Sequence, residues 1–204
     1  MNGKIVLVTG ASSGIGLAAA KAFVNAGATV YGTSRHPKAE TENGIRMLPL
    51  DTTSEKSVSE CIDTLLSREG RLDVLVNNAG SGIAGAVTDM TTDELLFQLN
   101  VNVLGMHRMV RAASEALIKS KGRIVNISSV AGFVPIPFQS AYSASKYAVE
   151  SLTECLNIEL HPFGVKAVLV EPGDTKTGFT KSRTIVKTIS PRFEERFTAS
   201  VKRM

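Results

Sequence analysis

Short apolar runs alternate with longer, helix-like stretches along most of the chain. Residues 4–9 form a nearly continuous apolar run, which is typical of a strand buried on both faces of a parallel sheet. An alanine-rich stretch at 17–25 follows and favours a helix. The same alternation predicts further strands at 29–33, 46–50, 72–76, 123–127 and 165–170, and further helices at 55–68, 92–119 and 142–161.

This order of elements predicts one α/β domain over residues 1–204. Strands that alternate with helices form a mostly parallel sheet, and right-handed crossovers place helices on both of its faces. We therefore expect the doubly wound, Rossmann-like arrangement. The pattern ends in an amphipathic, basic stretch at 191–204 that we expect to be a solvated helix.

Charge and composition exclude several classes of protein. Residues 181–204 contain seven Lys and Arg against two Glu, which gives this segment a net charge of +5. The whole chain has a net charge of +4, so the remaining residues sum to −1. This balance argues against a nucleic-acid-binding face on the main body. No apolar run reaches membrane-spanning length, and the first residues lead directly into a strand. Cys61 and Cys155 lie far apart and outside any metal-binding spacing, so we expect two reduced core thiols in a cytoplasmic protein without a metal site.

Small and polar residues follow four of the predicted strands. They are the glycine loop Gly10–Gly16, the segment Asn77–Gly80, the pair Ser128-Ser129 and the pair Pro172-Gly173. In a doubly wound sheet, ligands bind beyond the carboxyl ends of the strands. These four segments are therefore expected to meet at one ligand-binding edge.

The glycine loop lies between a strand and a helix, as a phosphate-binding turn does. Its spacing is G-x-x-x-G-x-G rather than the common G-x-G-x-x-G. Glycines let the backbone approach a pyrophosphate closely, and the following helix offers free N–H groups. The loop could also be only a tight connection between the two elements.

Tyr142 and Lys146 are spaced to act on one atom. Positions i and i+4 lie on the same face of a helix, so both side chains can reach one spot. A nearby ammonium group favours the phenolate and lowers the pKa of a tyrosine, whereas burial raises it. The pair is a candidate acid/base device, in which the Lys146 charge and a cationic cofactor ring must outweigh desolvation.

Together these segments resemble the short-chain dehydrogenase/reductase family. The resemblance rests on Thr9–Gly16, Asn77–Gly80, Ser129, Tyr142-x-x-x-Lys146 and Pro172–Thr177, in the family's order and spacing, and it extends from Lys4 to about Phe179. Within the family, the sequence is most similar to hydroxysteroid- and retinol-dehydrogenase-like members.

The resemblance implies a catalytic set of four residues. Tyr142 is the implied proton donor in reduction, and Lys146 the implied partner that lowers its pKa and binds the nicotinamide ribose. Ser129 matches the serine that polarises the substrate, and Asn102 matches the asparagine that anchors a water in a proton relay. Two donors directed at one carbonyl oxygen suit the anion that hydride addition creates.

The residues at the end of the second strand favour NADP over NAD. An NAD-specific site usually has an acid there, but this stretch reads Thr33-Ser34-Arg35-His36. Arg35 can form a bidentate contact with a 2′-phosphate, and the resemblance places Asp51 at the adenine. The residues expected to contact the cofactor are Gly10, Ser12, Ser13, Gly14, Ile15, Gly16, Arg35, Asp51, Asn78, Ala79, Gly80, Tyr142, Lys146, Pro172, Gly173, Thr175 and Thr177.

We expect an NADP-dependent oxidoreductase that acts on a hydrophobic secondary alcohol or its ketone. Two alternatives stay open: a 3-oxoacyl-thioester reductase, which uses the same catalytic set, and an NADP-binding or interaction protein with weak turnover. The helices at 92–119 and 142–161 carry more apolar and small residues than one sheet-facing stripe needs. This excess suggests a second buried face that includes Met109, Ala112, Ala113, Ala148, Val149 and Leu152. The resemblance implies a four-helix interface built from these two helices of each subunit, so we expect a homodimer.

The resemblance also implies a final strand that this sequence lacks. Residues 177–204 are expected to form a partial substrate lid and the basic helix, and 165–170 an exposed sheet edge. We expect poor turnover and a mobile or displaced tail in this 204-residue form. The chain is either truncated or a natural short form in which 191–204 or a partner covers the edge.

Overall fold

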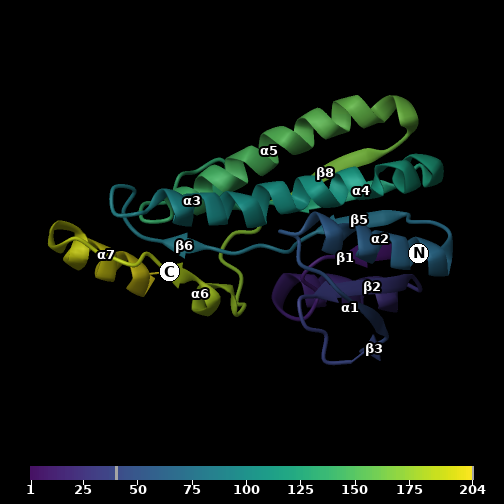
Figure 1. Ribbon diagram of the computed structural model, residues 1–204, viewed down its shortest axis with the longest axis horizontal. Coiled ribbons are helices and arrows are strands. Elements are labelled where there is room, and N and C mark those ends of the chain that lie inside the picture. The colour runs from purple at the N-terminus through teal and green to yellow at the C-terminus, as the bar shows by residue number, and fades with distance from the viewer. Residues whose placement is uncertain (40, 204) are drawn as a thin grey trace.

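A computed structural model describes residues 1–39 and 41–203, and a seven-stranded sheet forms its centre (Figure 1). The strand order is β3-β4-β2-β1-β5-β7-β8, and the six strands from β4 to β8 run parallel to one another. This arrangement confirms the predicted doubly wound α/β fold. The strands are β1 (Ile5–Val8), β2 (Thr29–Ser34), β3 (Thr41–Glu42), β4 (Ile45–Pro49), β5 (Val74–Asn77), β7 (Arg123–Ile127) and β8 (Lys166–Val170).

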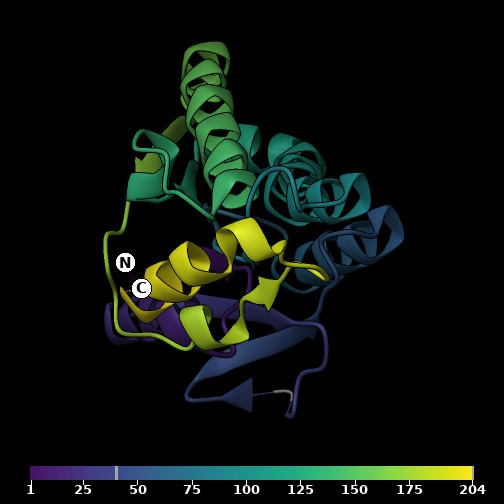
Figure 2. The same cartoon turned by 90° about the vertical axis from the view of Figure 1, so that its left-hand side faces the viewer.

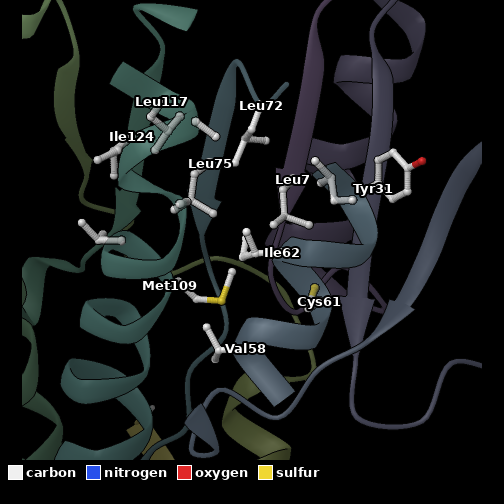
Figure 3. Close-up of a cluster of buried hydrophobic side chains, with 14 of the residues drawn as sticks. Leu7, Tyr31, Val58, Cys61, Ile62, Leu72, Leu75, Met109, Leu117 and Ile124 are labelled. Carbon is white, nitrogen blue, oxygen red and sulfur yellow. The ribbon is translucent and has the colours of Figure 1, made fainter. Parts of the chain in front are cut away.

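Helices cover both faces of this sheet. The apolar residues of α2, α4 and α5 form one buried cluster with the sheet, and those of α1 form a second cluster on the other face. Figure 3 shows the first cluster, in which Val58 and Ile62 of α2 face Met109 of α4 beside Leu75 of the sheet. The helices are α1 (Gly14–Asn25), α2 (Glu55–Glu69), α3 (Thr92–Leu99), α4 (Gly105–Ser120), α5 (Ser140–Leu160), α6 (Phe179–Ser182) and α7 (Pro191–Arg203).

The two cysteines occupy different environments. Cys61 on α2 lies in the core, where burial raises its thiol pKa to about 12. Cys155 on α5 is exposed, so the prediction of a core thiol is wrong there. Helix α5 buries one face against the sheet, and Cys155 lies outside that face.

The predicted continuous helix at 92–119 is interrupted. Helix α3 starts with the capping box between Thr91 and Glu94 and ends at Leu99. A π-helical segment, Asn100–Leu104, then joins it to α4, and the N–H of Gly105 donates to the carbonyl of Asn100, five residues back. Asn102 lies inside this segment with 4% of its surface exposed. A regular helical pattern in the sequence gives no sign of such a segment.

Half of the predicted interface residues belong to the core of the chain itself. Met109, Ala113 and Val149 are buried against the sheet, so assigning them to a second face was wrong. Leu152 is exposed, and Ala112 and Ala148 are partly buried. The exposed apolar side chains on these helices include Leu96, Phe97, Leu104, Tyr147 and Ile158.

The C-terminal segment packs against Ile83–Ala84 and Phe138 at one end of the molecule. Two short strands, β6 (Ile83–Ala84) and β9 (Thr184–Ile185), pair in parallel, which the sequence did not predict. The ring of Phe138 makes edge contacts with Phe193 and Phe197 of α7, at centroid distances of 6.3 and 5.6 Å. Figure 2 shows α6 and α7, in yellow, crossing this end of the molecule. The tail helix is therefore docked, contrary to the expectation of a displaced one; Glu40 and Met204 lie outside the described residues.

Strand β8 is the edge strand of the sheet, as predicted. Its Val168 and Val170 side chains are 38% and 42% exposed. Helix α7 packs against Phe138 instead, so the idea that 191–204 covers this edge is wrong for the residues that the structure describes. Across residues 1–39 and 41–203, none of the helices is both long enough and hydrophobic enough to cross a bilayer.

Candidate active site

The four segments predicted to meet do lie at one edge of the sheet. The N–H groups of Asn78 and Ala79, after β5, donate to the hydroxyl of Thr9 at the end of β1, at 3.0 and 2.9 Å. After β7, the N–H of Val130 donates to the carbonyl of Pro172, which follows β8, at 3.2 Å. This edge therefore holds the glycine loop, the Asn77–Gly80 segment, Ser129 and Pro172-Gly173 within one site.

The glycine loop needs its glycines for two separate reasons. Gly10 and Gly14 have φ angles of +66° and +55°, a region that favours glycine. A Cβ atom at Gly16 would lie only 2.4 Å from both the Asn78 Nδ2 and the Gly10 carbonyl oxygen. The amide of Asn78 occupies that space and donates to the Thr9 and Gly10 carbonyls at 2.9 and 3.1 Å. The loop is thus braced from β5 and stays close-packed beneath the start of α1.

The start of α1 fits a phosphate group. Ser13 is the N-cap residue but gives no side-chain cap hydrogen bond within the described residues, so N–H groups of the first turn face outward without that partner. Ser12 and Ser13 are exposed beside them. From the other side of the site, Thr177 approaches Gly14, with its Cβ 3.6 Å from the place where a Cβ on Gly14 would be. A pyrophosphate placed there would meet N–H donors, hydroxyl groups and the positive end of the helix dipole.

The start of α5 places Tyr142 and Lys146 on one side of this edge. The Nζ of Lys146 lies 5.6 Å from the centre of the Tyr142 ring and donates to the Ile127 carbonyl at 2.7 Å. Ser129 follows β7, and its hydroxyl hydrogen-bonds with the Tyr142 phenol. The structure thus brings together three of the four predicted catalytic residues.

Burial dominates the protonation of this group. It raises the pKa of Tyr142, while the hydrogen bond from Ser129 and the positive charge of Arg183 act in the opposite direction. It also lowers the pKa of Lys146 to about 8, against a smaller upward effect of Glu150. In the chain alone, burial is therefore the largest influence on the Tyr142 pKa. Lys146 directs its ammonium group to the Ile127 carbonyl, and its combined effect with a cationic cofactor ring stays a prediction.

Asn102 joins the loop after β5 to helix α5. Its Oδ1 accepts from the Ser81 N–H at 2.9 Å, and its Nδ2 donates to the Ser81 carbonyl and to the Ser145 hydroxyl at 3.0 and 2.9 Å. Gln98, one turn earlier and fully buried, donates to the Ser81 carbonyl and accepts from the Ile83 N–H. These amides tie the loop after β5 to α5 and hold it beside the helix turn that carries Tyr142 and Lys146.

The segment after β8 folds over Tyr142. The ring of Phe179, the first residue of α6, lies 5.5 Å from the Tyr142 ring. The N–H of Thr184 donates to the Gly82 carbonyl at 2.9 Å, and Ser190 donates to Asp89 through both its N–H and its hydroxyl. This segment is therefore attached to the residues on both sides of β6.

Comparison with known proteins identifies the family. Residues 4–187 match the short chain dehydrogenase family. The chain belongs to this family. A 3-ketodihydrosphingosine reductase of Bacteroides thetaiotaomicron is 46% identical over 186 residues, which are 91% of this chain and 69% of that protein.

Solved structures of the family superpose closely on the chain. A short-chain dehydrogenase from Streptomyces avermitilis has a TM-score of 0.88 at 36% identity, covering 98% of this chain and 78% of that one. The structure of ElxO with NADP bound has a TM-score of 0.82 at 36% identity, covering 87% of this chain and 75% of that one. The chain thus spans 69% to 78% of the length of these three family members.

The predicted adenosine contacts of this short-chain dehydrogenase lie beyond β2 and β4. Arg35 is exposed just after β2. The pKa of Asp51 is lowered mainly by hydrogen bonds from Thr53 and to a smaller extent by the positive charge of Arg35. Asp51 accepts from the Thr53 N–H and hydroxyl at 2.9 and 2.7 Å. The two residues are therefore near neighbours, with a cation available on the side of the site where a ribose phosphate would lie.

Sequence reasoning missed several residues that shape the dehydrogenase site. The glycine-loop motif includes Thr9 but does not show that its hydroxyl accepts hydrogen bonds from two backbone N–H groups. Ser145 and Gln98 were not singled out, although Ser145 lies three residues after Tyr142 and Gln98 four before Asn102, which are same-face spacings. Phe179 and Arg183 carry no local signal, because their position depends on the pairing of β6 with β9.

Proposed function

We propose that this chain is an NADP-dependent oxidoreductase that interconverts a hydrophobic secondary alcohol and its ketone. The observation that carries the proposal is the group Ser129, Tyr142 and Lys146 beside a glycine loop with free helix N–H groups. Family membership supports the oxidoreductase reaction, and a relative whose structure contains NADP supports the cofactor. Residues 177–190 act as the substrate lid of this single domain.

Different residues of the chain would bind different parts of NADP. Gly14, Ile15 and Gly16 would hold the pyrophosphate through backbone N–H groups, and Arg35 with Ser12 or Ser13 would hold the 2′-phosphate. Asn78, Ala79, Gly80, Pro172 and Gly173 would line the nicotinamide end together with Thr175 and Thr177. When bound, the cofactor supplies or accepts the hydride and brings a positively charged ring in its oxidised form.

Two hydroxyl groups handle the substrate oxygen. In reduction, Ser129 donates a hydrogen bond to the carbonyl oxygen while Tyr142 transfers its phenolic proton to it. In oxidation, the Tyr142 phenolate takes the proton from the alcohol. Lys146 stabilises that phenolate when its ammonium group is protonated, and Asn102 holds the loop after β5 against α5 through Ser81 and Ser145.

Arg35 gives the cofactor preference a direct test. We expect NADPH to bind at least about tenfold more tightly than NADH, and Arg35→Ala to remove most of this difference, since a charge-assisted bidentate contact is worth about 1.5–3 kcal/mol. Fluorescence titration with both cofactors measures it. Lys38→Ala, which removes another exposed cation shortly after β2, is the matched control and should leave the preference unchanged. Equal affinity of the unaltered protein for NADH and NADPH would refute the assignment.

Turnover is tested with NADPH and a panel of substrates. The panel contains hydrophobic ketones of increasing chain length and an acetoacetyl thioester. Faster oxidation of NADPH with the ketones supports the proposal, which the 46% identical ketodihydrosphingosine reductase favours. Faster oxidation with the thioester would instead support the 3-oxoacyl-thioester reductase. Tight NADPH binding without turnover of any compound would support the binding protein.

A further inference from the structure

The segment after β8 brings Arg183 near enough to Tyr142 for its positive charge to lower the pKa of the phenol. Arg183 immediately precedes β9, whose Thr184 lies opposite Ile83 and donates to the Gly82 carbonyl at 2.9 Å. The Cγ of Arg183 is 3.4 Å from the place where a Cβ on Gly82 would be, and the Cζ of Phe179 is 3.1 Å from the same place. The Phe179 ring also lies 5.5 Å from the Tyr142 ring, so Gly82, Arg183 and Phe179 are neighbours beside the tyrosine.

Contacts on the C-terminal side of Arg183 hold this group in place. Val186 is buried against Gly85, and the N–H of Lys187 donates to the Glu94 carboxylate at 3.0 Å. Ser190 donates to Asp89 at 2.8 Å. The strand pairing and these hydrogen bonds hold the backbone, so the position of Arg183 beside Tyr142 is set by the lid's own contacts.

Arg183 keeps a positive charge in a partly desolvated place. Its side chain is partly buried, and burial lowers the pKa of its guanidinium while the phenol of Tyr142 raises it. An arginine remains protonated despite such a shift, because its ordinary pKa lies far above neutrality. A cation that has lost part of its hydration gains most from an anionic partner with two acceptor oxygens.

We propose that Arg183 binds an anionic group of the substrate, a carboxylate or a phosphate, close to the reacting carbonyl. This inference rests on the proposed function, and it narrows the substrate to an amphiphilic, acidic ketone or alcohol. The carbonyl oxygen lies on Ser129 and Tyr142, the anion on Arg183, and the apolar remainder meets Phe179 and the exposed side chains of Phe133 and Val134. Of these contacts, only Arg183 carries a charge, so a substitution of Arg183 removes the anion contact and leaves the other two in place.

Pairs of acidic and neutral ketones test this assignment. We would measure kcat/KM with NADPH for acetoacetate against ethyl acetoacetate, and for dihydroxyacetone phosphate against dihydroxyacetone. Arg183→Gln should lower kcat/KM about 10- to 100-fold for the acidic member that the site prefers, as expected for a charged hydrogen bond, and less than about threefold for its neutral partner. Lys187→Gln, an exposed lid cation, is the matched control. The more strongly affected pair distinguishes carboxylate from phosphate.

Binding measurements separate this inference from the proposed function. Calorimetric titration of acetoacetate and dihydroxyacetone phosphate into the protein with NADP⁺ requires no turnover. If the unaltered protein reduces no ketone, the proposed function fails, but weaker binding of an acidic ketone to Arg183→Gln still supports the inference. Equal losses for acidic and neutral ketones, or weaker NADPH binding by Arg183→Gln, would overturn it, because Arg183 would then serve Tyr142, the fold or the cofactor.

Discussion

Tyr142 and Lys146 lie one helical turn apart, and burial shifts their pKa values in opposite directions. It raises the pKa of the phenol and lowers that of the ammonium group, so it favours the neutral form of both. A neutral, protonated tyrosine is the form that reduction needs. Oxidation needs the phenolate, which requires Lys146 to hold its proton, and a pKa of about 8 places that change close to neutral pH.

Removing the phenolic hydroxyl tests the role of Tyr142. Tyr142→Phe keeps the ring and its contact with Phe179 but cannot donate a proton. We expect turnover to fall by about 10²–10⁴-fold, with little change in NADPH affinity. Steady-state kinetics and a cofactor titration measure the two quantities. Retention of more than about a tenth of the original turnover would contradict the mechanism.

Lys146 predicts a pH-dependent effect on stability. Its folded pKa of about 8 lies below the ordinary value of 10.5, so folding disfavours its charged form. This penalty is complete well below pH 8 and disappears as the pH rises towards 10.5, where the unfolded chain also loses the proton. Lys146→Met should therefore raise the melting temperature at pH 6.5 and raise it less at pH 9.5, while abolishing turnover. A loss of stability of equal size at both pH values would show that the hydrogen bond to Ile127 dominates instead.

At the scale of elements, the glycine loop and its brace behave as one unit. Asn78 fills the space that a side chain at Gly16 would need, and Thr9 receives the N–H groups of the next segment. A sequence shows the glycines, because their spacing between a strand and a helix is local. It does not show that Asn78 is the reason for Gly16, because that contact joins residues 62 positions apart in the chain.

Gly16→Ala tests this packing. The new Cβ would meet Asn78 Nδ2 and the Gly10 carbonyl at 2.4 Å, so the loop must move. We expect at least about a tenfold loss of NADPH affinity, equal to 1.4 kcal/mol, and a lower melting temperature. Gly178→Ala is the matched control, since nothing lies within 4 Å of its Cβ position and its φ of −74° suits alanine. NADPH binding that is equal in the two variants would contradict the close-packing argument.

Local patterns predicted the elements, and long-range contacts set the exceptions. The six parallel strands and the convergence of Ser129, Tyr142 and the glycine loop followed from apolar runs and from the rule for strand ends. The interruption at Asn100–Leu104 and the pairing of β6 with β9 did not, since both depend on partners distant in sequence. The prediction that Met109 and Val149 lie on an outer face of their helices was also wrong, because composition does not give the angle at which a helix packs.

At the scale of the molecule, α3, the π-helical segment and α5 present exposed apolar side chains. Leu96 and Phe97 lie on α3, Leu104 ends the π-helical segment, and Tyr147 and Ile158 lie on α5. In a two-fold symmetric dimer, the same surface of each subunit would be buried against its copy. We therefore still predict a homodimer, with this surface in place of the buried residues first assigned to it.

Light scattering with a charged substitution tests the dimer. Leu152→Glu on α5 should shift the molar mass at micromolar concentration towards that of a monomer, because a carboxylate would be buried in the interface. Val87→Glu, at an exposed apolar residue outside these helices, should leave the molar mass unchanged. A monomeric unaltered protein, or an equal response of both variants, would argue against this interface.

The π-helical segment makes the active site and the core depend on a single helical phase. Asn100–Leu104 contains one residue more than a regular turn, so deleting one residue there would restore an ordinary α-helix. Everything beyond it would then rotate by about 100° relative to α3. Either Asn102 would leave Ser81 and Ser145, or Met109 and Leu117 would leave the core. This stretch therefore tolerates substitutions of side chains far better than a change in length, and a single deletion would be felt in catalysis and in folding together.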